Sequence, residues 1–175
     1  MRRAFALALP WLLAGCAAMQ PAGETTATAE LRTASGQSAG TVHLAQVGGV
    51  VRIVLEAKAL PPGLHAFHVH AVGRCDPPDF TSAGPHFNPT SKQHGALNPH
   101  GSHAGDLPNL SVGADGTGRL ETATEQITLG AGPTSLWDAD GSSLVVHAAP
   151  DDFKTDPTGN AGARIACGVV TKSPK

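Results

Sequence analysis

Three histidines fall within six residues in the run GLHAFHVH, residues 63–70, of a chain of 175 residues that contains nine histidines. Side chains two residues apart in a β-strand point to the same face. His68 and His70 therefore project together, whereas His65 has the other parity. Two imidazoles side by side on a strand predict a two-nitrogen metal chelate rather than histidines that only pack.

A second group of possible ligands follows in residues 72–107, a long stretch rich in Gly, Pro, Asn and Ser. The group consists of His86, His94, His103 and Asp106. Three imidazoles and one carboxylate form a suitable tetrahedral zinc set, and bound metal would order a loop of this length. His100, the extra histidine of this stretch, is expected to be exposed to solvent rather than to act as an auxiliary ligand.

His147 ends the apolar run LVVH. If this run forms a strand beside residues 64–71, His147 joins His68 and His70 around one centre. Several imidazoles around one centre favour copper, which has a high affinity for nitrogen and a tetragonal preference.

The elements that must position these residues are short strands. Eight β-prone runs are predicted near 28–34, 40–46, 49–58, 64–71, 108–113, 117–128, 143–149 and 164–171. In the third run Val51, Ile53 and Leu55 alternate with polar or outward-facing residues, as in a half-buried strand. No segment keeps a helical apolar period for three turns. The pattern predicts an all-β sandwich or barrel with two long loops, 72–107 and 150–163.

The N-terminus has the pattern of an export signal. Residues 1–15 begin MRR, continue with an apolar run too short to span a membrane, and precede Cys16. The run LAGC resembles the lipobox of bacterial lipoproteins, in which the cysteine becomes the lipidated first residue. The alternative is an ordinary signal peptide with a chance cysteine. Residues 16–28 are predicted to be a flexible tether and residues 29–175 the folded domain.

With Cys16 assigned to lipid, two cysteines remain, Cys75 and Cys167. In an exported chain they predict one disulfide, and two free thiols are the weaker alternative. The formal charge is −2, and it becomes −4 when the two arginines of residues 1–15 are removed. The chain has no basic stripe, which excludes nucleic acid as an expected partner.

Taken in order, the runs GLHAFHVH, TSAGPHFNP, KQHG, HAGDLPNL, LVVHAAPDD and GNAGARIACGVV resemble the copper/zinc superoxide dismutases. The resemblance spans about residues 63–170. It implies an eight-stranded Greek-key β-barrel, an immunoglobulin-like sandwich, and an enzyme that disproportionates superoxide. It also implies one copper ion and one zinc ion per subunit, copper held by His68, His70, His86 and His147, and zinc by His86, His94, His103 and Asp106.

The same resemblance implies roles for further residues. His86 would bridge the two metals and move a proton, and Arg164 would stand beside copper. The remaining roles are a carboxylate that links a copper histidine to a zinc histidine (Asp151), a structural histidine (His65) and a disulfide (Cys75 with Cys167). The loop 150–163 carries one lysine, Lys154, against three aspartates. The residues that guide anionic superoxide beyond Arg164 therefore stay undetermined.

An exported, lipidated member of this family is expected in the periplasm, held to the outer membrane only through Cys16. A monomer and a homodimer both remain open. The alternative functions are a copper or zinc buffer or metallochaperone on the same fold, and a structural or adhesive surface lipoprotein. The complete ligand set together with Arg164 favours the enzyme.

Overall fold

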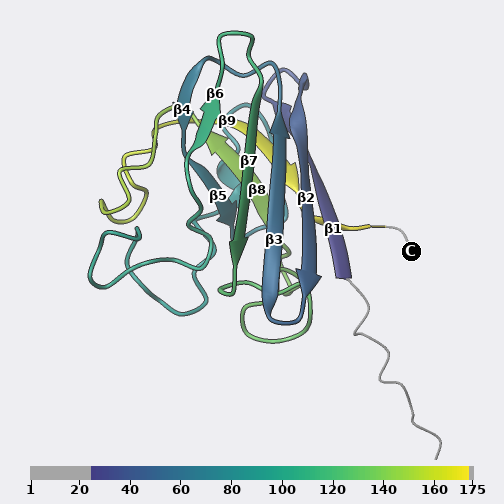
Figure 1. Cartoon of the computed structure of the whole chain (residues 1–175), viewed down its shortest axis with the longest axis vertical. Coiled ribbons are helices and arrows are strands. Elements are labelled where there is room, and N and C mark those ends of the chain that lie inside the picture. The colour runs from purple at the N-terminus through teal and green to yellow at the C-terminus, as the bar shows by residue number, and fades with distance from the viewer. Residues whose placement is uncertain (1–24, 174–175) are drawn as a thin grey trace, which may run out of the picture.

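Ten strand segments make up most of the regular structure in the computed structural model, which describes residues 25–173 (Figure 1). Their bounds are β1 Thr25–Thr33, β2 Ser38–Val47, β3 Val50–Ala57, β4 Gly63–His65, β5 Phe67–His70, β6 Leu110–Val112, β7 Gly118–Thr124, β8 Ser143–His147, β9 Arg164–Val169 and β10 Thr171–Lys172. The one helical element among the described residues is a 3₁₀ turn, η1 Thr81–Ala83. No helix in residues 25–173 is long and apolar enough to cross a membrane.

The strands pair antiparallel in the order β4-β6-β7-β3-β2-β1-β9-β8-β5. β4 and β5 lie at the two ends of this order but are consecutive halves of one predicted strand, so the sheet nearly closes into a barrel. The connection from β3 to β4 passes β7 and β6, which then return to the edge of β3, as in a Greek key. β9 and β10 are likewise consecutive parts of one predicted strand. The ten segments therefore correspond to the eight predicted strands, and the all-β prediction is confirmed.

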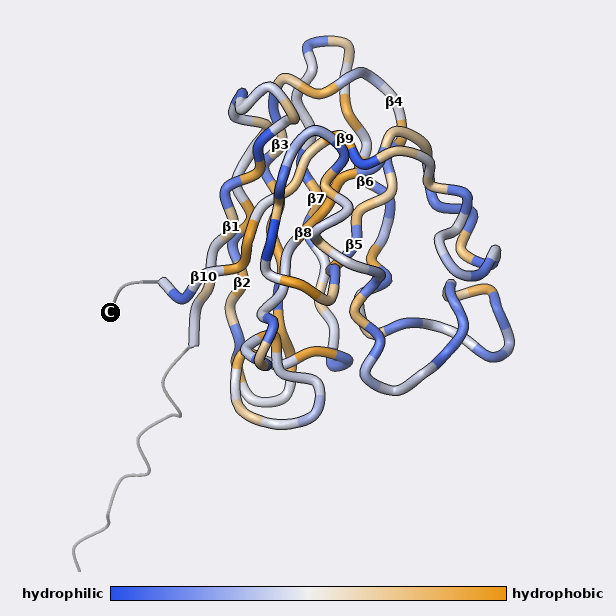
Figure 2. The backbone as a smooth tube through the Cα atoms, turned by 180° about the vertical axis from the view of Figure 1, so that it is seen from behind, coloured by the Kyte–Doolittle hydropathy of each residue, from blue (hydrophilic) through white to orange (hydrophobic). Residues whose placement is uncertain are grey.

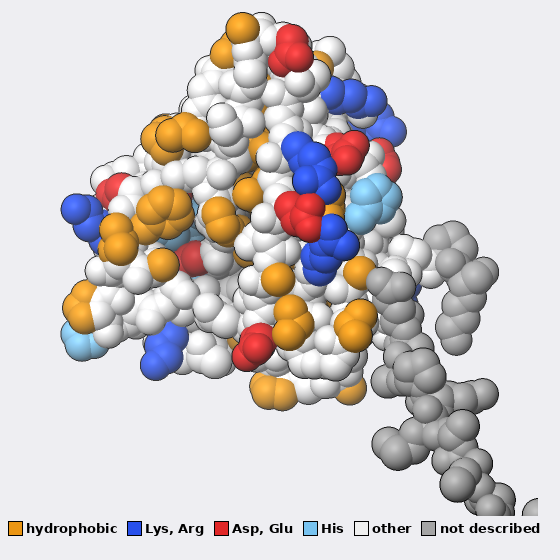
Figure 3. All heavy atoms as spheres, in the orientation of Figure 1, with side chains coloured by type: hydrophobic (Ala, Val, Ile, Leu, Met, Phe, Trp, Pro, Cys, Tyr) orange, Lys and Arg blue, Asp and Glu red, His pale blue; other side chains and the backbone are white. Residues whose placement is uncertain are grey.

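Alternation of side chains builds the core of the barrel. Val51, Ile53 and Leu55 of β3 are fully buried, as their spacing predicted. In Figure 2 apolar and hydrophilic residues alternate along the strands. The outer face of β3 carries Arg52, which pairs with Glu121 of β7. Blue and red side chains accordingly lie side by side on the face shown in Figure 3.

The first strand starts earlier than the sequence suggested. Residues 25–28, which were predicted to belong to the tether, pair with β2, and Thr25 lies opposite Gln46. The prediction was wrong for these residues because their small and polar composition resembled a linker, although β-branched threonines suit a strand. The signal peptide and Cys16 lie outside the described residues.

Two loops extend from the same side of the barrel (Figure 1). Residues 71–109 connect β5 to β6, and residues 148–163 connect β8 to β9. All four residues of β5 are buried: Phe67 and Val69 lie in the core, and His68 and His70 are covered on the outer face. The loops thus enclose a polar site against the outside of the barrel.

Candidate metal centre

The strand histidines converge at one centre. His68 and His70 project from β5, and His147 ends β8, which pairs with β5. Together with His86 from the first loop, each offers a ring nitrogen, and these four atoms lie within 4.8 Å of one another. The Nε2 atoms of His70 and His147 are 3.3 Å apart. Four imidazole nitrogens around one point form the donor set that copper favours.

The loop residues form a second centre around one carboxylate oxygen. Asp106 Oδ1 lies 3.1 Å from Nδ1 of His86, 3.1 Å from Nδ1 of His94 and 3.2 Å from Nδ1 of His103. The other oxygen, Asp106 Oδ2, accepts the backbone N–H groups of Gly95 and His103. Three nitrogens and one oxygen match a four-coordinate zinc site.

Hydrogen bonds away from the centre fix which nitrogen of each strand histidine is free. His68 Nε2 donates to Asp151 Oδ2 at 2.8 Å, His70 Nδ1 to the Gly84 carbonyl at 2.9 Å, and His147 Nδ1 to the Gly162 carbonyl at 3.2 Å. A neutral imidazole has one donor, so the opposite nitrogens keep lone pairs that face the centre.

Three buried ring nitrogens without hydrogen-bond partners indicate that these residues fit metal ions. His68 Nδ1, His86 Nε2 and His94 Nδ1 are buried and have no hydrogen-bond partner in the protein. A buried polar atom without a partner is costly unless something binds it. All three belong to the two convergent donor sets, so metal ligation accounts for them.

His86 is the residue shared by the two sets. Its Nδ1 faces Asp106, and its Nε2 faces the copper set without another partner. Residues 86 and 87 lie against β5. The backbone of His86 forms an isolated antiparallel β-bridge with His70, and the Phe87 N–H donates to the Val69 carbonyl at 2.8 Å. Burial lowers the pKa of His86 to about 4, and the neighbouring His68 also lowers it. The hydrogen bond to Asp106 acts in the opposite direction but is outweighed.

Asp151 joins the two halves of the centre. It accepts Nε2–H of His68 at 2.8 Å and Nε2–H of His94 at 2.9 Å. Although burial acts to raise it, these hydrogen bonds hold the pKa of Asp151 well below its usual range. Since the nitrogens that face Asp151 are opposite those that would bind the metal ions, the cluster of Asp151, His68 and His94 is a link between the two sites and not a third site.

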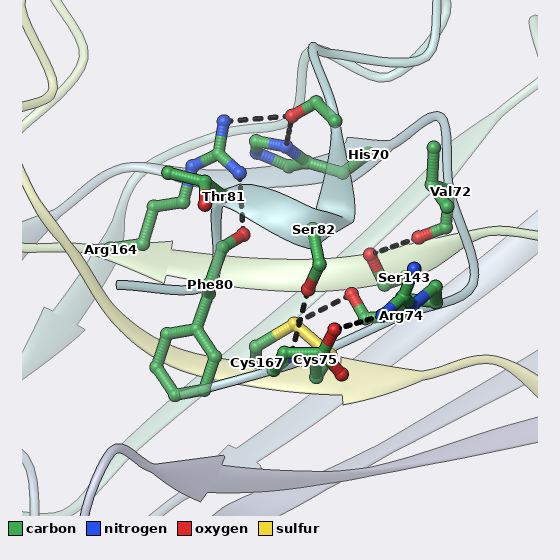
Figure 4. Close-up of a disulfide and its surroundings, with 12 residues drawn as sticks. His70, Val72, Arg74, Cys75, Phe80, Thr81, Ser82, Ser143, Arg164 and Cys167 are labelled. Atoms are coloured by element: carbon green, nitrogen blue, oxygen red, sulfur yellow. Dashed lines mark hydrogen bonds and ion pairs between the residues drawn. A yellow bond between two sulfur atoms is a disulfide. The ribbon is translucent and has the colours of Figure 1, made fainter. Parts of the chain in front are cut away.

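Arg164 stands at the start of β9 beside the copper set. Its Nη1 donates to the Phe80 carbonyl at 2.6 Å and its Nη2 to the Gly84 carbonyl at 2.7 Å. The Gly84 oxygen also accepts from His70, so one carbonyl connects the guanidinium to a copper-set histidine (Figure 4).

The disulfide between Cys75 and Cys167 lies beneath this arrangement (Figure 4). It ties the first part of the loop to β9, and Phe80 packs against Cys167 and Val145. The prediction of one bridge is confirmed, and the alternative of two free thiols is wrong.

The other histidines lie apart from the two donor sets. His65 Nδ1 faces the His147 carbonyl at 2.8 Å, and its Nε2 faces the Pro61 carbonyl at 2.8 Å. The strand parity of His65 had excluded it from the chelate. His100 is exposed and belongs to neither donor set, as expected.

Sequence reasoning missed the groups that hold the ligands from behind. Gly84 and Gly162 act through backbone carbonyls, which leave no signature in residue type. Asn109 was also missed: its side chain accepts the Asp151 N–H at 2.8 Å and donates to the Asp151 carbonyl at 3.0 Å. Its place directly before a buried strand, in HAGDLPNL, was the one available signal.

Comparison with known proteins agrees with this geometry. The family model described as copper/zinc superoxide dismutase (SODC) matches residues 38–170. A superoxide dismutase [Cu-Zn] from Aquifex aeolicus is 48% identical over 85% of this chain and 89% of its own length. One from Caulobacter vibrioides is 47% identical over 83% of this chain and 85% of its own.

A solved structure shares the fold. The crystal structure of a SOD-like protein from Bacillus subtilis superposes with a TM-score of 0.76 at 40% identity, covering 81% of this chain and 96% of that one. The barrel, the two complete donor sets that share His86, and the match over residues 38–170 lead to one conclusion. This chain belongs to the copper/zinc superoxide dismutase family.

Proposed function

We propose that the chain disproportionates superoxide to oxygen and hydrogen peroxide at the copper set, with zinc in a structural role. Copper, when bound, supplies the alternating one-electron chemistry, which redox-silent zinc cannot. The observation that carries the proposal is the presence of two complete, largely buried donor sets that share His86.

His86 is proposed to hold and release a proton at Nε2. This atom faces the copper set and has no other hydrogen-bond partner in the protein. On the opposite side, Nδ1 is held beside Asp106. The ring can therefore exchange a proton at one nitrogen while the other keeps it in place, and the proton can pass to nascent peroxide.

Arg164 is proposed to dock the anionic substrate. It is partly buried, and two carbonyls fix its guanidinium beside His70. A fixed cation next to the reaction centre attracts a small anion without reorganising. Asp151, which accepts from His68 and His94, is proposed to orient both rings, and His65 to support the strand behind His147.

We further propose that the chain is exported and held by lipid at Cys16 to the outer membrane, facing the periplasm. The signal-like residues 1–15 and the disulfide, which persists in oxidising compartments, support export. So does a 44% identical relative from Brugia pahangi that is named as extracellular. Labelling cells with a fatty acid tests the anchor: a wild-type protein without label, like a Cys16→Ala variant, would contradict it.

A homodimer also remains a proposal, and sedimentation distinguishes it from a monomer.

The enzyme is tested by superoxide decay in stopped flow, using residues 17–175 loaded with copper and zinc. We expect fast decay in the wild type. In a His147→Ala variant decay falls by at least about 100-fold, because changes merely behind the ligands already cost about 10–100-fold.

The main alternative is a copper or zinc buffer on the same fold. Its distinguishing result is a wild-type protein that binds both metals, as measured by elemental analysis, yet leaves the decay of superoxide unchanged. Arg164, held beside the copper set, favours the enzyme, because metal storage needs no docked anion.

A further inference from the structure

Asp79 shapes the turn that holds Arg164. Its Oδ1 accepts the backbone N–H of Thr81 at 3.0 Å and the Thr81 hydroxyl at 2.9 Å. Phe80, between them, has a left-handed backbone with φ 56°, and its carbonyl accepts from Arg164 Nη1 at 2.6 Å. The carboxylate that stabilises this turn is therefore the sequence neighbour of a residue that fixes the guanidinium.

Asp79 also brings a negative charge close to that guanidinium. It is exposed, and the hydrogen bonds from Thr81, together with the charge of Arg164, lower its pKa, so it is ionised at neutral pH. Burial lowers the pKa of Arg164, and the charge of Asp79 opposes this effect. Asp76, on the same loop, is paired instead with Arg74.

We propose that Asp79 limits the attraction that Arg164 exerts on small anions, while its hydrogen bonds to Thr81 keep Arg164 in position. The charge of Asp79 thus weakens the capture of superoxide and the binding of competing anions together. This inference rests on the proposed function, in which Arg164 docks the substrate.

Two substitutions separate the two roles. Asp79→Asn removes the charge but keeps an oxygen that can accept from Thr81, so the turn and the Phe80 carbonyl stay in place. Asp79→Ala removes both the charge and the acceptor, which loosens the turn.

The chain offers a closely matched control in Asp115, in the turn between β6 and β7. Its Oδ1 accepts the Thr117 N–H at 3.0 Å and the Thr117 hydroxyl at 2.8 Å, the same local motif. It is likewise exposed and belongs to neither donor set. Asp115→Asn therefore changes the net charge equally at a different place.

The experiment uses the full metal-loaded protein and two measurements. The dissociation constant of azide is titrated from the visible absorption of the copper protein, and superoxide decay is followed across ionic strength. For Asp79→Asn we expect azide to bind about two- to threefold more tightly, as one nearby charge in a water-like dielectric allows. Superoxide decay should be faster by a similar factor at low ionic strength, and the gain should vanish in high salt.

The other variants complete the test. Asp115→Asn should leave both measurements at the wild-type values. Asp79→Ala should lose the gain of Asp79→Asn, because the Phe80 carbonyl, one of the two that hold Arg164, is no longer fixed. The inference is overturned if Asp79→Asn leaves azide binding unchanged, or if Asp115→Asn has the same effect, which would show a dependence on net charge alone. If no variant consumes superoxide, the proposed function fails, while the azide titration still tests Asp79.

Discussion

The copper half and the zinc half of the centre are built in different ways. Three of the four copper-set ligands project from the barrel strands β5 and β8, whose pairing fixes their backbones. The zinc-set ligands all come from the loop between β5 and β6, which has almost no regular structure of its own.

This difference separates a site that the fold provides from a site that orders its own loop. The hydrogen bonds and core packing of the barrel set the spacing of His68 and His70 before any metal binds. In the zinc half, Asp106 contacts the backbone of Gly95 and His103, so one ligand residue holds the loop turns together. Metal-binding free energy there is also ordering free energy of the loop.

The first part of the same loop is secured in a third way, by the disulfide between Cys75 and Cys167, separated by 92 residues. Replacing both cysteines with serine should lower the free energy of unfolding by about 4–5 kcal/mol on the chain-entropy model. Chemical denaturation of the metal-free proteins measures this loss.

Removal of the disulfide should affect ligand binding at the copper set more than at the zinc set. Azide binding at the copper set should weaken, because Phe80 and the turn that holds Arg164 lose their attachment to β9. Zinc affinity should change much less. An equal loss at both sites would break the distinction between the two parts of the loop.

Removing a zinc ligand should loosen the loop, whereas removing a copper ligand should not. In His103→Ala, amide hydrogen exchange in residues 88–106 should accelerate by at least about 10³-fold, equivalent to about 4 kcal/mol of local ordering. In His147→Ala the same amides should keep their protection. Similar acceleration in both variants would mean that the copper half also depends on metal for its order.

The sequence predicted the copper half better than the supports of either half. Strand parity alone placed His68 and His70 on one face, and the alternation of Val51, Ile53 and Leu55 placed β3 in the barrel. That His147 joins them depends on the pairing of β8 with β5, which no local pattern reveals.

Two features escaped prediction for physical reasons. The strand predicted over 64–71 divides at Ala66, where the chain leaves β6 as a partner and joins β8, and both halves carry the same β-prone residues. The carbonyls of Gly84 and Gly162 orient His70 and His147 through the backbone, which residue type does not encode. The zinc set could be assembled from residue types because it lies within one loop.

The stability of the metal-free protein should fall in acid and in base because of different histidines. Burial, reinforced by neighbouring imidazoles, lowers the pKa of His86 to about 4 and that of His147 to about 3. Below about pH 6.5 the unfolded chain binds protons that these folded residues reject. Stability should therefore fall as the pH drops from 6.5 towards 4, on the order of 3 kcal/mol per histidine.

The pKa of His94 shifts in the opposite direction, so its effect on stability has the opposite dependence on pH. Burial opposes its protonation, but the neighbouring carboxylates of Asp106 and Asp151 outweigh burial and raise the pKa of His94 to about 9. Its contribution is complete below pH 6.5 and is lost as the pH rises through 9. Urea denaturation from pH 4 to 9.5 should thus show a maximum near 6.5. His147→Gln should reduce the loss on the acid side only; a change on the alkaline side would contradict this assignment.

The smallest expected effect concerns the contact between the two halves. An added Cβ at Gly159, where φ is +63°, would collide with Asp151 Oδ1 and lie 2.6 Å from His94 Nε2. Gly48 has nearly the same backbone, with φ +61°, but nothing within 4 Å of an added Cβ. Gly48→Ala should cost about 1 kcal/mol of stability from backbone strain alone.

Gly159→Ala should cost about 1 kcal/mol more than that and should also weaken zinc binding about tenfold, as loss of support behind a ligand does. Competition with a chelator measures the affinity, and thermal unfolding measures the stability of both variants. The difference between them isolates the displacement of Asp151 from the strain of the turn. Equal zinc affinities would show that the loop yields to the extra methyl group, so that the carboxylate between His68 and His94 joins two halves that do not depend on each other.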